Sequence, residues 1–355
     1  MTLLSDTLTT IINGDVPSRE ELTALIDTFM QGGDMAAELY ERARSRAEAV
    51  RDEHYGRRIF LRGLIEFTSY CKNDCYYCGL RRSNRRAERY RLTEEEILEC
   101  CEYGASLGFH TFVLQGGEDA YFTDERLCGI VSKIKSAHPE CAITLSVGER
   151  SLASYKALRE AGADRYLLRH ESATDTHYAR LHPSELTLEK RKQCLYDLKS
   201  LGYQVGAGFM VASPYQTGEN LANDLLFLCE LQPQMVGIGP FIPHRDTPFG
   251  EYAAGTLELT LFMLALTRLM LPKVLLPATT ALGTIAPDGR ERGVLAGANV
   301  VMPNLSPVSV RKKYLLYNDK LCSGDETVEH IRELGERFKK IDCALDMSRG
   351  DSMNI

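Results

Sequence analysis

Residues 59–68 read IFLRGLIEFT, a short apolar run that leads directly into three closely spaced cysteines. Seven further apolar runs follow along the chain, and amphipathic segments with helical spacing lie between them. These runs are FHTFVLQ, CAITLSV, DRYLLR, YQVGAGFMV, MVGIGPF, KVLLPATT and ANVVMP. Eight strand-then-helix units over roughly 270 residues predict an α/β fold, a (β/α)8 TIM-type barrel. A doubly wound open sheet is the alternative.

Helix start signals separate the predicted strands. Thr93 and Glu96 form a capping box before an apolar helix face, and Ser151 precedes another. Residues 1–52 are rich in Leu, Ala, Glu and Arg and are expected to form a helical extension packed on the barrel. We therefore expect this extension to be followed at 53–355 by the barrel and a C-terminal helix.

Composition restricts the class of protein. The 355 residues carry a net charge of −7, which argues against a general nucleic-acid or membrane-surface binder. No apolar run approaches the length of a membrane span, and the N-terminus lacks the features of a signal peptide. Eleven cysteines in a chain of this length indicate a reducing, cytoplasmic environment rather than a disulfide scaffold.

The cysteine triplet Cys71, Cys75 and Cys78 has the spacing C-x3-C-x2-C and follows the first predicted strand. A structural zinc site would need a fourth ligand from elsewhere. A 4Fe–4S cluster held by three thiolates would keep one iron open. That iron could chelate the amino and carboxylate groups of a methionine-type ligand, as radical chemistry on S-adenosylmethionine (SAM) requires. A zinc site, or simple burial of the thiols, is the alternative.

Two cations share one face of the fourth predicted strand. Arg165 and Arg169 lie at alternating positions, so their side chains point the same way. Two cations that face into a barrel need an anionic guest or a partner. The alternative is a salt bridge within the core.

The chain resembles a known family through motifs on several strands. C-x3-C-x-aromatic-C, with Tyr77 before the last cysteine, resembles the signature of the radical SAM superfamily. LQGGED, RYLLRHES, GAGFMV, MVGIGPFIPHRDTP, PATTALGT and GANVVMPNLSP together are similar to the HydE family, the radical SAM maturase of FeFe-hydrogenase. The resemblance runs from about residue 55 to 320.

The resemblance implies a role for each matching residue. Cys71, Cys75 and Cys78 would ligate the cluster. Residues expected to bind the cofactor are Tyr77, Gln115, Gly116, Gly117, Glu118, Ser146, Arg169, Glu171, Arg191 and Met210. Residues expected to line the substrate cavity are Thr144, Arg165, Thr279, Thr280 and Tyr314. The histidines His170 and His244 are expected to make hydrogen bonds rather than to bind metal.

The resemblance also implies an activity. The enzyme would receive one electron from a reductant, cleave SAM to methionine and a 5′-deoxyadenosyl radical, and help to assemble the diiron subsite of the H-cluster. Its substrate would be an iron complex of cysteine, CO and cyanide, and its partners a second radical SAM maturase and a GTPase scaffold. The alternatives are a reaction like that of methylornithine synthase or biotin synthase, and a non-catalytic iron–sulfur scaffold.

Two further segments carry expectations. Some HydE proteins hold an accessory cluster on a C-terminal cysteine triad, but here only Cys322 fits and Cys343 lies too far along, so no second cluster is expected. The other cysteines are expected to be small buried apolar residues: Cys100, Cys101, Cys128, Cys141, Cys194 and Cys229. Six arginines between Arg81 and Arg91 are expected to form a rim that binds the helix region above the cluster or meets an acidic partner, with a solvated loop as the alternative.

Overall fold

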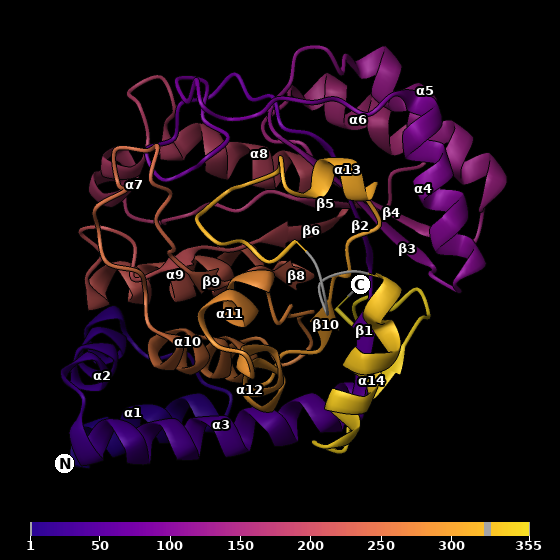
Figure 1. The fold of residues 1–355 in the computed structure, drawn as a ribbon. Helices are drawn as coiled ribbons and strands as arrows, with labels where there is room; N and C mark the ends of the chain where they lie inside the picture. Colours follow the sequence, from indigo (N-terminus) through magenta and orange to yellow (C-terminus); the bar gives the residue numbers. More distant parts are fainter. Residues whose placement is uncertain (1, 323–327, 355) are drawn as a thin grey trace.

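The strands form a parallel barrel. The structure is a computed structural model that describes residues 2–322 and 328–354. Six neighbouring strands pair in order: β2 (Gly63–Thr68), β3 (Thr111–Gly116), β4 (Ala142–Ser146), β5 (Arg165–Leu167), β6 (Gln204–Ala207) and β8 (Met235–Val236). Isolated parallel bridges join Met235 to Leu275, Pro277 to Val300 and Asn304 to Leu64. They continue the pairing from β8 back to β2, so the predicted TIM-type architecture is confirmed (Figure 1).

Three of the predicted strands differ in detail from the apolar runs. The first run divides at Arg62 into β1 (Arg58–Leu61) and β2, because β1 pairs with β10 (Val300–Val301) and β11 (Ala344–Asp346) whereas β2 pairs with β3. The fifth and sixth runs divide in the same way, which adds the short pair β7 (Met210–Val211) and β9 (Gly239–Pro240). Where the fifth run divides, Gly208 has φ +148°, and a Cβ there would lie 2.0 Å from the carbonyl oxygen of Gly237.

Helices follow the strands and cover the outside of the barrel. The side chain of Thr93 caps α4 in the predicted capping box with Glu96, and that of Ser151 caps α6. The helices after the first barrel strand are α4 (Glu94–Ser106), α5 (Asp124–Ala137), α6 (Leu152–Glu160), α7 (Asp175–Leu181), α8 (Leu188–Ser200), α9 (Gly218–Leu231), α10 (Leu257–Met270), α11 (Thr280–Ile285), α12 (Gly289–Leu295), α13 (Val308–Arg311), the 3-10 turn η2 (Val328–His330) and α14 (Ile331–Lys339).

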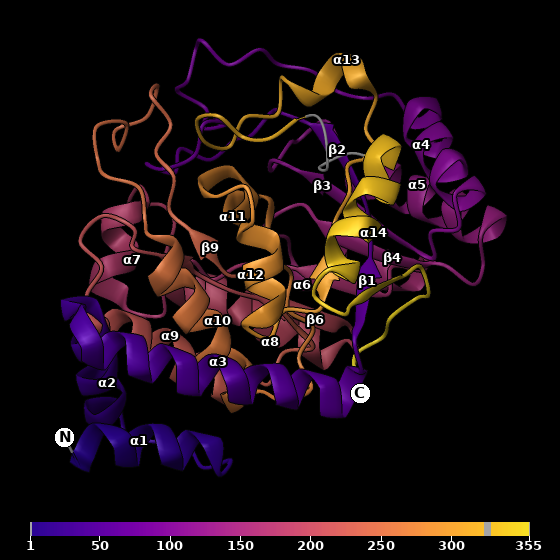
Figure 2. The same cartoon turned by 60° about the horizontal axis from the view of Figure 1, so that its bottom comes forward.

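Three helices precede the barrel: α1 (Thr2–Ile12), α2 (Arg19–Gln31) and α3 (Gly33–Tyr55). Figure 2 shows α3 running along the barrel beside α10 and α12. The ring of Phe29 in α2 stacks on that of Phe262 in α10 with centroids 4.1 Å apart. Burial of these aromatic and aliphatic side chains holds the helices on the barrel.

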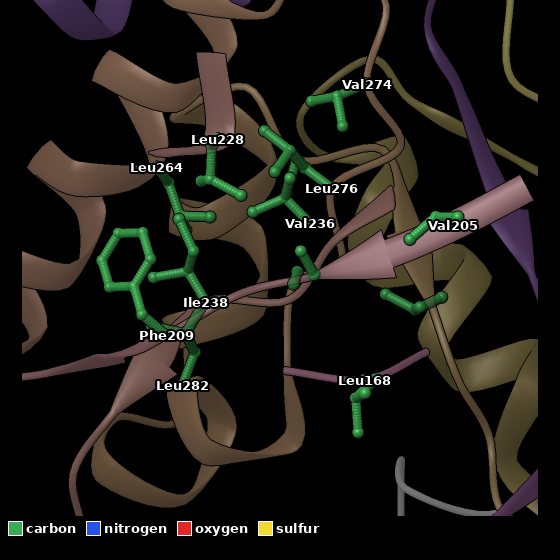
Figure 3. Packing of buried hydrophobic residues seen from close by; sticks show 14 of the residues in the cluster. Leu168, Val205, Phe209, Leu228, Val236, Ile238, Leu264, Val274, Leu276 and Leu282 are labelled. Atoms are coloured by element: carbon green, nitrogen blue, oxygen red, sulfur yellow. The ribbon is translucent and has the colours of Figure 1, made fainter. Parts of the chain in front are cut away.

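The core lies between the barrel strands and the surrounding helices. Leu228 of α9 and Leu264 of α10 meet Val236 and Ile238 from the region of β8 (Figure 3). Side chains at alternating strand positions face outward to this layer, which follows from the two-residue period of a strand. The remaining strand positions face the barrel interior.

The C-terminal segment after β11 closes the end of the barrel where the strands begin. The carbonyl oxygen of Arg349 accepts hydrogen bonds from Thr111 and Arg165, which begin β3 and β5. Asp351 accepts from Arg165 at 2.6 Å and from Gln204 at 2.7 Å. The terminal nitrogens of Arg165 are therefore bonded to the chain itself, whereas its Nε is buried without a hydrogen-bond partner among the described residues.

None of the helices that the structure describes is both long enough and apolar enough to cross a membrane.

Candidate active site

The three cysteines of the triplet lie on one loop after β2, at the end of the barrel where the parallel strands finish. Backbone hydrogen bonds hold this loop on both sides, from Lys72 to Glu118 at 2.9 Å and from Tyr76 to Leu181 at 2.9 Å. All three cysteine residues are partly exposed, and none of the eleven cysteines, all of which are described, is paired in a disulfide. The loop therefore presents three unpaired thiols to the mouth of the barrel.

A glycine lets the loop after β3 approach the cysteine loop. A Cβ on Gly117 would lie 2.2 Å from the carbonyl oxygen of Tyr70 and 2.7 Å from the Cβ of Cys71. Any side chain there would push the two loops apart, so the position requires glycine for reasons of space. The next residue, Glu118, accepts a hydrogen bond from the backbone of Glu149 at 2.9 Å and pairs with Lys72 at 3.2 Å.

Two ion pairs follow β4 and β5 at the same end. Nη2 of Arg169 lies 3.0 Å from Oε2 of Glu171, and Nε of Arg191 lies 2.7 Å from Oε1 of Glu149. All four of these buried atoms lack an aligned hydrogen-bond partner among the described residues, as does the hydroxyl of Tyr178. Buried polar groups without such a partner indicate a place for a ligand.

The backbone of Glu171 is strained. Its φ of +64° lies in the left-handed region, which residues other than glycine rarely adopt. A hydrogen bond from its N–H to Gly208 at 3.0 Å holds it there. Behind it, His170 accepts from Gly208 at 3.3 Å and lies 3.3 Å from Asp224, with both side chains fully buried. Strain that surrounding contacts maintain is typical of functional sites.

Burial and nearby charged side chains shift the pKa values of the cysteine thiols. Burial raises the pKa of Cys75, with Glu171 adding to the rise and Arg191 opposing it. Burial raises the pKa of Cys78 to about 12, and Arg89 opposes this rise. Binding of metal must therefore displace the thiol protons. Met210 belongs to a small buried apolar cluster against which Tyr76 and Tyr77 of the cysteine loop pack.

A buried ion pair occupies the barrel mouth beside Tyr314. Lys320 donates to Oε1 of Glu66 at 2.6 Å and to the carbonyl oxygen of Tyr314 at 3.1 Å. Burial raises the pKa of Tyr314, as do Glu66 and Cys78, whereas a hydrogen bond with Gln115 lowers it. This predicted residue thus lies close to the cysteine loop.

The remaining predicted residues lie at different depths in the barrel. Gln115 is paired with Ser146 at the ends of β3 and β4, and Thr279 caps the start of α11, where Thr280 is the first residue. Thr144 is buried in the middle of β4, and its hydroxyl has no partner among the described residues. It therefore lies deeper in the barrel than the cysteine loop.

The assignment of Arg165 to the substrate cavity is wrong. Arg165 is the first residue of β5, and its fully buried side chain pairs with Asp351 at the opposite end of the barrel. The partner that two inward cations require is thus supplied by the chain, while Arg169 pairs with Glu171. The alternating pattern did not place both cations at one end, because Arg165 begins β5 and Arg169 lies beyond its last residue, Leu167.

Sequence reasoning missed Glu149, Glu66 and Lys320. Glu149 stands in SVGER directly after the third barrel strand, and a carboxylate at the C-terminal end of a barrel strand is a signal that could have found it. Glu66 interrupts the apolar run of β2, and a charge inside a buried strand demands a partner. That Lys320 is the partner could not be read from a separation of 254 residues.

The six arginines of the basic segment at 81–91 fall into two groups. Arg81 binds Asp74 inside the cysteine loop at 2.7 Å, Arg89 donates to the carbonyl oxygen of Leu80 at 2.9 Å, and Arg91 binds Asp119 at 2.6 Å. These three arginines hold the loop in place. The other three, by contrast, are exposed to solvent: Arg82, Arg85 and Arg86.

The donor set fits a cluster with an open corner. Three thiols lie on one loop, and no three His, Cys, Asp or Glu side chains of the described residues converge on a single metal ion. Thiolates that each bind a different iron of a cubane need not converge on one point. The buried atoms of Glu171, Arg169 and Tyr178 without hydrogen-bond partners fit a polar ligand such as SAM beside it.

The fold and this site define the class of protein: residues 65–228 match the Radical SAM superfamily, and the chain is a radical SAM enzyme. It is 48% identical over 276 residues to the [FeFe] hydrogenase maturase subunit HydE of Thermotoga maritima, with 78% of both chains covered. The chain therefore belongs to the HydE family. Members of this superfamily use a 4Fe–4S cluster and SAM.

Two other relatives are more distant. The 3-methylornithine synthase of Methanosarcina acetivorans is 30% identical over 323 residues, which cover 90% of this chain and 89% of that protein. The crystal structure of methylornithine synthase (PylB) superposes with a TM-score of 0.78 at 27% identity and covers 96% of this chain and 97% of that one. The identity to the HydE protein is well above both values.

The expected absence of a second cluster is not tested. The segment that would carry the rest of a cysteine triad begins after Cys322, and residues 323–327 lie outside the described part of the chain. Cys343 is buried, as are Cys100, Cys101, Cys141 and Cys194, whereas Cys128, Cys229 and Cys322 are partly exposed.

Proposed function

We propose that this radical SAM enzyme acts in maturation of FeFe-hydrogenase. It would work on a mononuclear iron complex of cysteine, CO and cyanide that is converted toward the diiron subsite of the H-cluster. The observation that carries the proposal is the three-thiol loop beside the Arg169–Glu171 and Glu149–Arg191 pairs, whose buried atoms lack hydrogen-bond partners. The identity of 48% with the Thermotoga maritima maturase supports a role in hydrogenase maturation.

The residues of the site would divide the work. Cys71, Cys75 and Cys78 hold the cluster and leave one iron for the amino and carboxylate groups of SAM. Once bound, the cluster and SAM supply reductive cleavage of the sulfonium and abstraction of a hydrogen atom. Glu171 and Arg191 hold polar groups of SAM through charged hydrogen bonds. Other groups would support binding of SAM: Tyr77, Gln115, Gly116, Gly117, Glu118, Ser146, Arg169 and Met210.

The substrate would lie above the cluster in the barrel mouth. Tyr314, Thr279 and Thr280 offer hydroxyl groups there, and Thr144 offers one deeper in the barrel. The surrounding barrel excludes water from the reacting groups.

Partners and location follow from the same proposal. A second radical SAM maturase would provide the iron complex, a GTPase scaffold would receive the product, and a protein reductant would supply one electron. Thiols that must stay reduced until they bind iron support a cytoplasmic location.

The test is anaerobic reconstitution with iron and sulfide, followed by dithionite and SAM. The expected result is formation of 5′-deoxyadenosine, and its loss in Glu171→Ala but not in the exposed control Glu185→Ala. A non-catalytic scaffold would bind iron equally well in all three proteins and form no deoxyadenosine, an outcome that would reject the proposal.

A competition between substrates tests the reaction itself. Deoxyadenosine formation is measured with the iron–cysteine–CO/cyanide complex, with lysine and with dethiobiotin. Stimulation by the iron complex alone is expected. Stimulation by lysine with formation of 3-methylornithine would instead favour the chemistry of the methylornithine synthases, which the 30% identity keeps as the second candidate.

A further inference from the structure

The turn that carries Glu171 is held on both sides by one carboxyl group from another element. Oδ1 of Asp224, in the middle of α9, accepts a hydrogen bond from the backbone N–H of Ala173 at 2.5 Å. The same oxygen lies 3.3 Å from Nε2 of His170. Asp224 therefore contacts the residue before Glu171 and the second residue after it.

Glu171 is the central residue of a three-residue turn. The N–H of Ser172 donates to the carbonyl oxygen of His170 at 2.8 Å, and φ of Glu171 is +64°. A hydrogen bond of this kind around a residue with positive φ is typical of the strained γ-turn, which persists only where the surrounding structure supports it. The two contacts of Asp224 lie on either side of this turn, where they can provide that support.

The ring of His170 connects Asp224 to Gly208, the residue that follows β6. Nδ1 of His170 accepts from the N–H of Gly208 at 3.3 Å, and the carbonyl oxygen of Gly208 accepts from the N–H of Glu171 at 3.0 Å. Burial lowers the pKa of His170 well below its ordinary value, so the ring is neutral and its proton is on Nε2, toward Asp224. Nε2 has no aligned hydrogen-bond partner among the described residues, so this contact is close without being a complete hydrogen bond.

The residues after Glu171 are also bonded to other parts of the chain. Oγ of Ser172 lies 2.9 Å from Nδ1 of His177, and Oγ1 of Thr174 accepts from Asn223 at 3.0 Å. Oε2 of Glu171, by contrast, is buried without an aligned partner in the described part of the chain. A fixed backbone that carries an incompletely bonded carboxylate is suited to a ligand, because its conformational freedom is lost before binding.

We propose that Asp224 and His170 are positioning residues for Glu171: they hold the turn in the conformation in which its carboxylate accepts a hydrogen bond from SAM. Neither residue would touch SAM itself. This inference rests on the proposed function, in which Glu171 is a ligand of SAM, and it names the groups that set the affinity of that ligand.

The primary test is a double-mutant cycle on equilibrium binding of SAM to the reconstituted protein, which requires no turnover. Asp224→Ala is expected to raise the dissociation constant for SAM about tenfold, with iron and sulfide content unchanged. In a Glu171→Ala background the same change should raise it less than about twofold, because the group that Asp224 positions is absent. Equal effects in the two backgrounds would overturn the inference.

Conservative variants separate positioning from simple loss of a buried group. Asp224→Asn keeps an acceptor oxygen for Ala173 and His170 and should bind SAM within about threefold of the unmodified chain. His170→Phe keeps an aromatic ring against Phe227, 5.0 Å away between centroids, but removes the acceptor for Gly208, so it should weaken binding as Asp224→Ala does. It also carries the cycle if Asp224→Ala does not fold. Equal losses in Asp224→Asn and Asp224→Ala would contradict the positioning role, because one of them retains the acceptor.

A destabilised control excludes a general effect on folding. Asp351→Asn removes the counter-charge of Arg165 at the opposite end of the barrel and should leave the affinity for SAM unchanged. Amide hydrogen exchange in the protein without cluster or SAM is a second readout. Residues 170–174 should exchange faster in Asp224→Ala than in Asp224→Asn or the control. Unchanged exchange of this segment in Asp224→Ala would also overturn the inference.

The same measurements distinguish failure of this inference from failure of the proposed function. Binding of SAM by Glu171→Ala as tightly as by the unmodified chain would remove Glu171 from the proposed site. Weakened binding in Glu171→Ala, with unchanged binding in both Asp224→Ala and His170→Phe, would reject only the positioning role.

Discussion

The two ends of the barrel give their polar side chains different partners. Where the strands begin, Arg165, Thr111 and Gln204 are bonded to the C-terminal segment. Where they finish, buried atoms of Arg169, Glu171 and Tyr178 have no aligned hydrogen-bond partner in the described chain. The same parallel strands carry both sets, so the difference comes from what the chain places across each end.

The comparison separates structural polarity from functional polarity. Arg165 has a hydrogen-bonded counter-charge, whereas the Arg169–Glu171 and Arg191–Glu149 pairs have opposite charges close together without aligned hydrogen bonds. Buried polar atoms of the second kind can still bond to a ligand. The strained backbone of Glu171 lies at the end of the barrel where the strands finish. Changes at the two ends should therefore affect different properties: stability at one end, and binding of the cluster and SAM at the other.

The largest expected effect is at the cysteine loop. Cys75→Ala should abolish assembly of the 4Fe–4S cluster and formation of deoxyadenosine, because one of three thiolate ligands is lost. Iron and sulfide content, visible absorbance and product analysis measure this outcome. The control Cys101→Ala changes a buried residue of α4 that is 1% exposed, and this variant should keep the cluster. Retention of a full cluster in Cys75→Ala would contradict the ligand assignment.

A large effect on stability is expected at the closed end. Asp351→Asn should reduce the free energy of unfolding by about 3 kcal/mol, because it leaves the fully buried Arg165 without its counter-charge. Denaturant unfolding measures this change. Asp342→Asn breaks an exposed pair with Arg57 and should cost at most about 1 kcal/mol. Equal losses in the two variants would remove the distinction between a structural and a surface ion pair.

The dependence on pH sharpens this test. Burial alone would raise the pKa of Asp351, but hydrogen bonds from Arg165 and Gln204 outweigh it and lower the pKa to about 2. A carboxyl whose folded pKa lies below its unfolded value of about 3.9 stabilises the fold above that value and loses this contribution as pH falls. The difference between the unmodified chain and Asp351→Asn should shrink as pH falls from about 5 toward 2.

The smallest expected effect is at a residue that positions another. Glu149→Gln should weaken binding of SAM roughly fivefold, about 1 kcal/mol, because Arg191 loses its charged partner. Equilibrium binding of SAM to the reconstituted protein measures the loss. Glu189→Gln, on the exposed face of α8, is the matched control. An unchanged affinity in Glu149→Gln would place Arg191 outside the SAM site.

The barrel could be predicted because local patterns repeat. Each apolar run and each cap, such as that of Thr93 on α4, is a property of a few neighbouring residues. The divisions at Arg62 and Gly208 could not be predicted, since they depend on which strand becomes the neighbour on each side. The C-terminal segment across the barrel was missed for the same reason: its partners Thr111, Arg165 and Gln204 are 147 to 238 residues away.

The rule that chemistry lies at strand ends located the cysteine triplet, because parallel strands bring their final residues to one end. Glu171 and Arg191 came instead from the family resemblance, and Arg191 lies in α8 rather than at the end of a strand. The alternating pattern failed for Arg165, because it gives the face of a strand and not the depth along it. Sequence reasoning missed Glu149 and Lys320, whose roles depend on a partner from a distant segment.

The amino-acid sequence by itself determined the thiol spacing, the order of strands and helices, and the family, because each depends on residues close together in the chain or on motifs in a fixed order. Only the tertiary structure decided which partner each buried charge has and whether its hydrogen bonds are complete. That decision depends on what closes each end of the barrel: Asp351 reaches Arg165 at one end, and at the other no described residue completes the hydrogen bonding of Arg169 and Glu171.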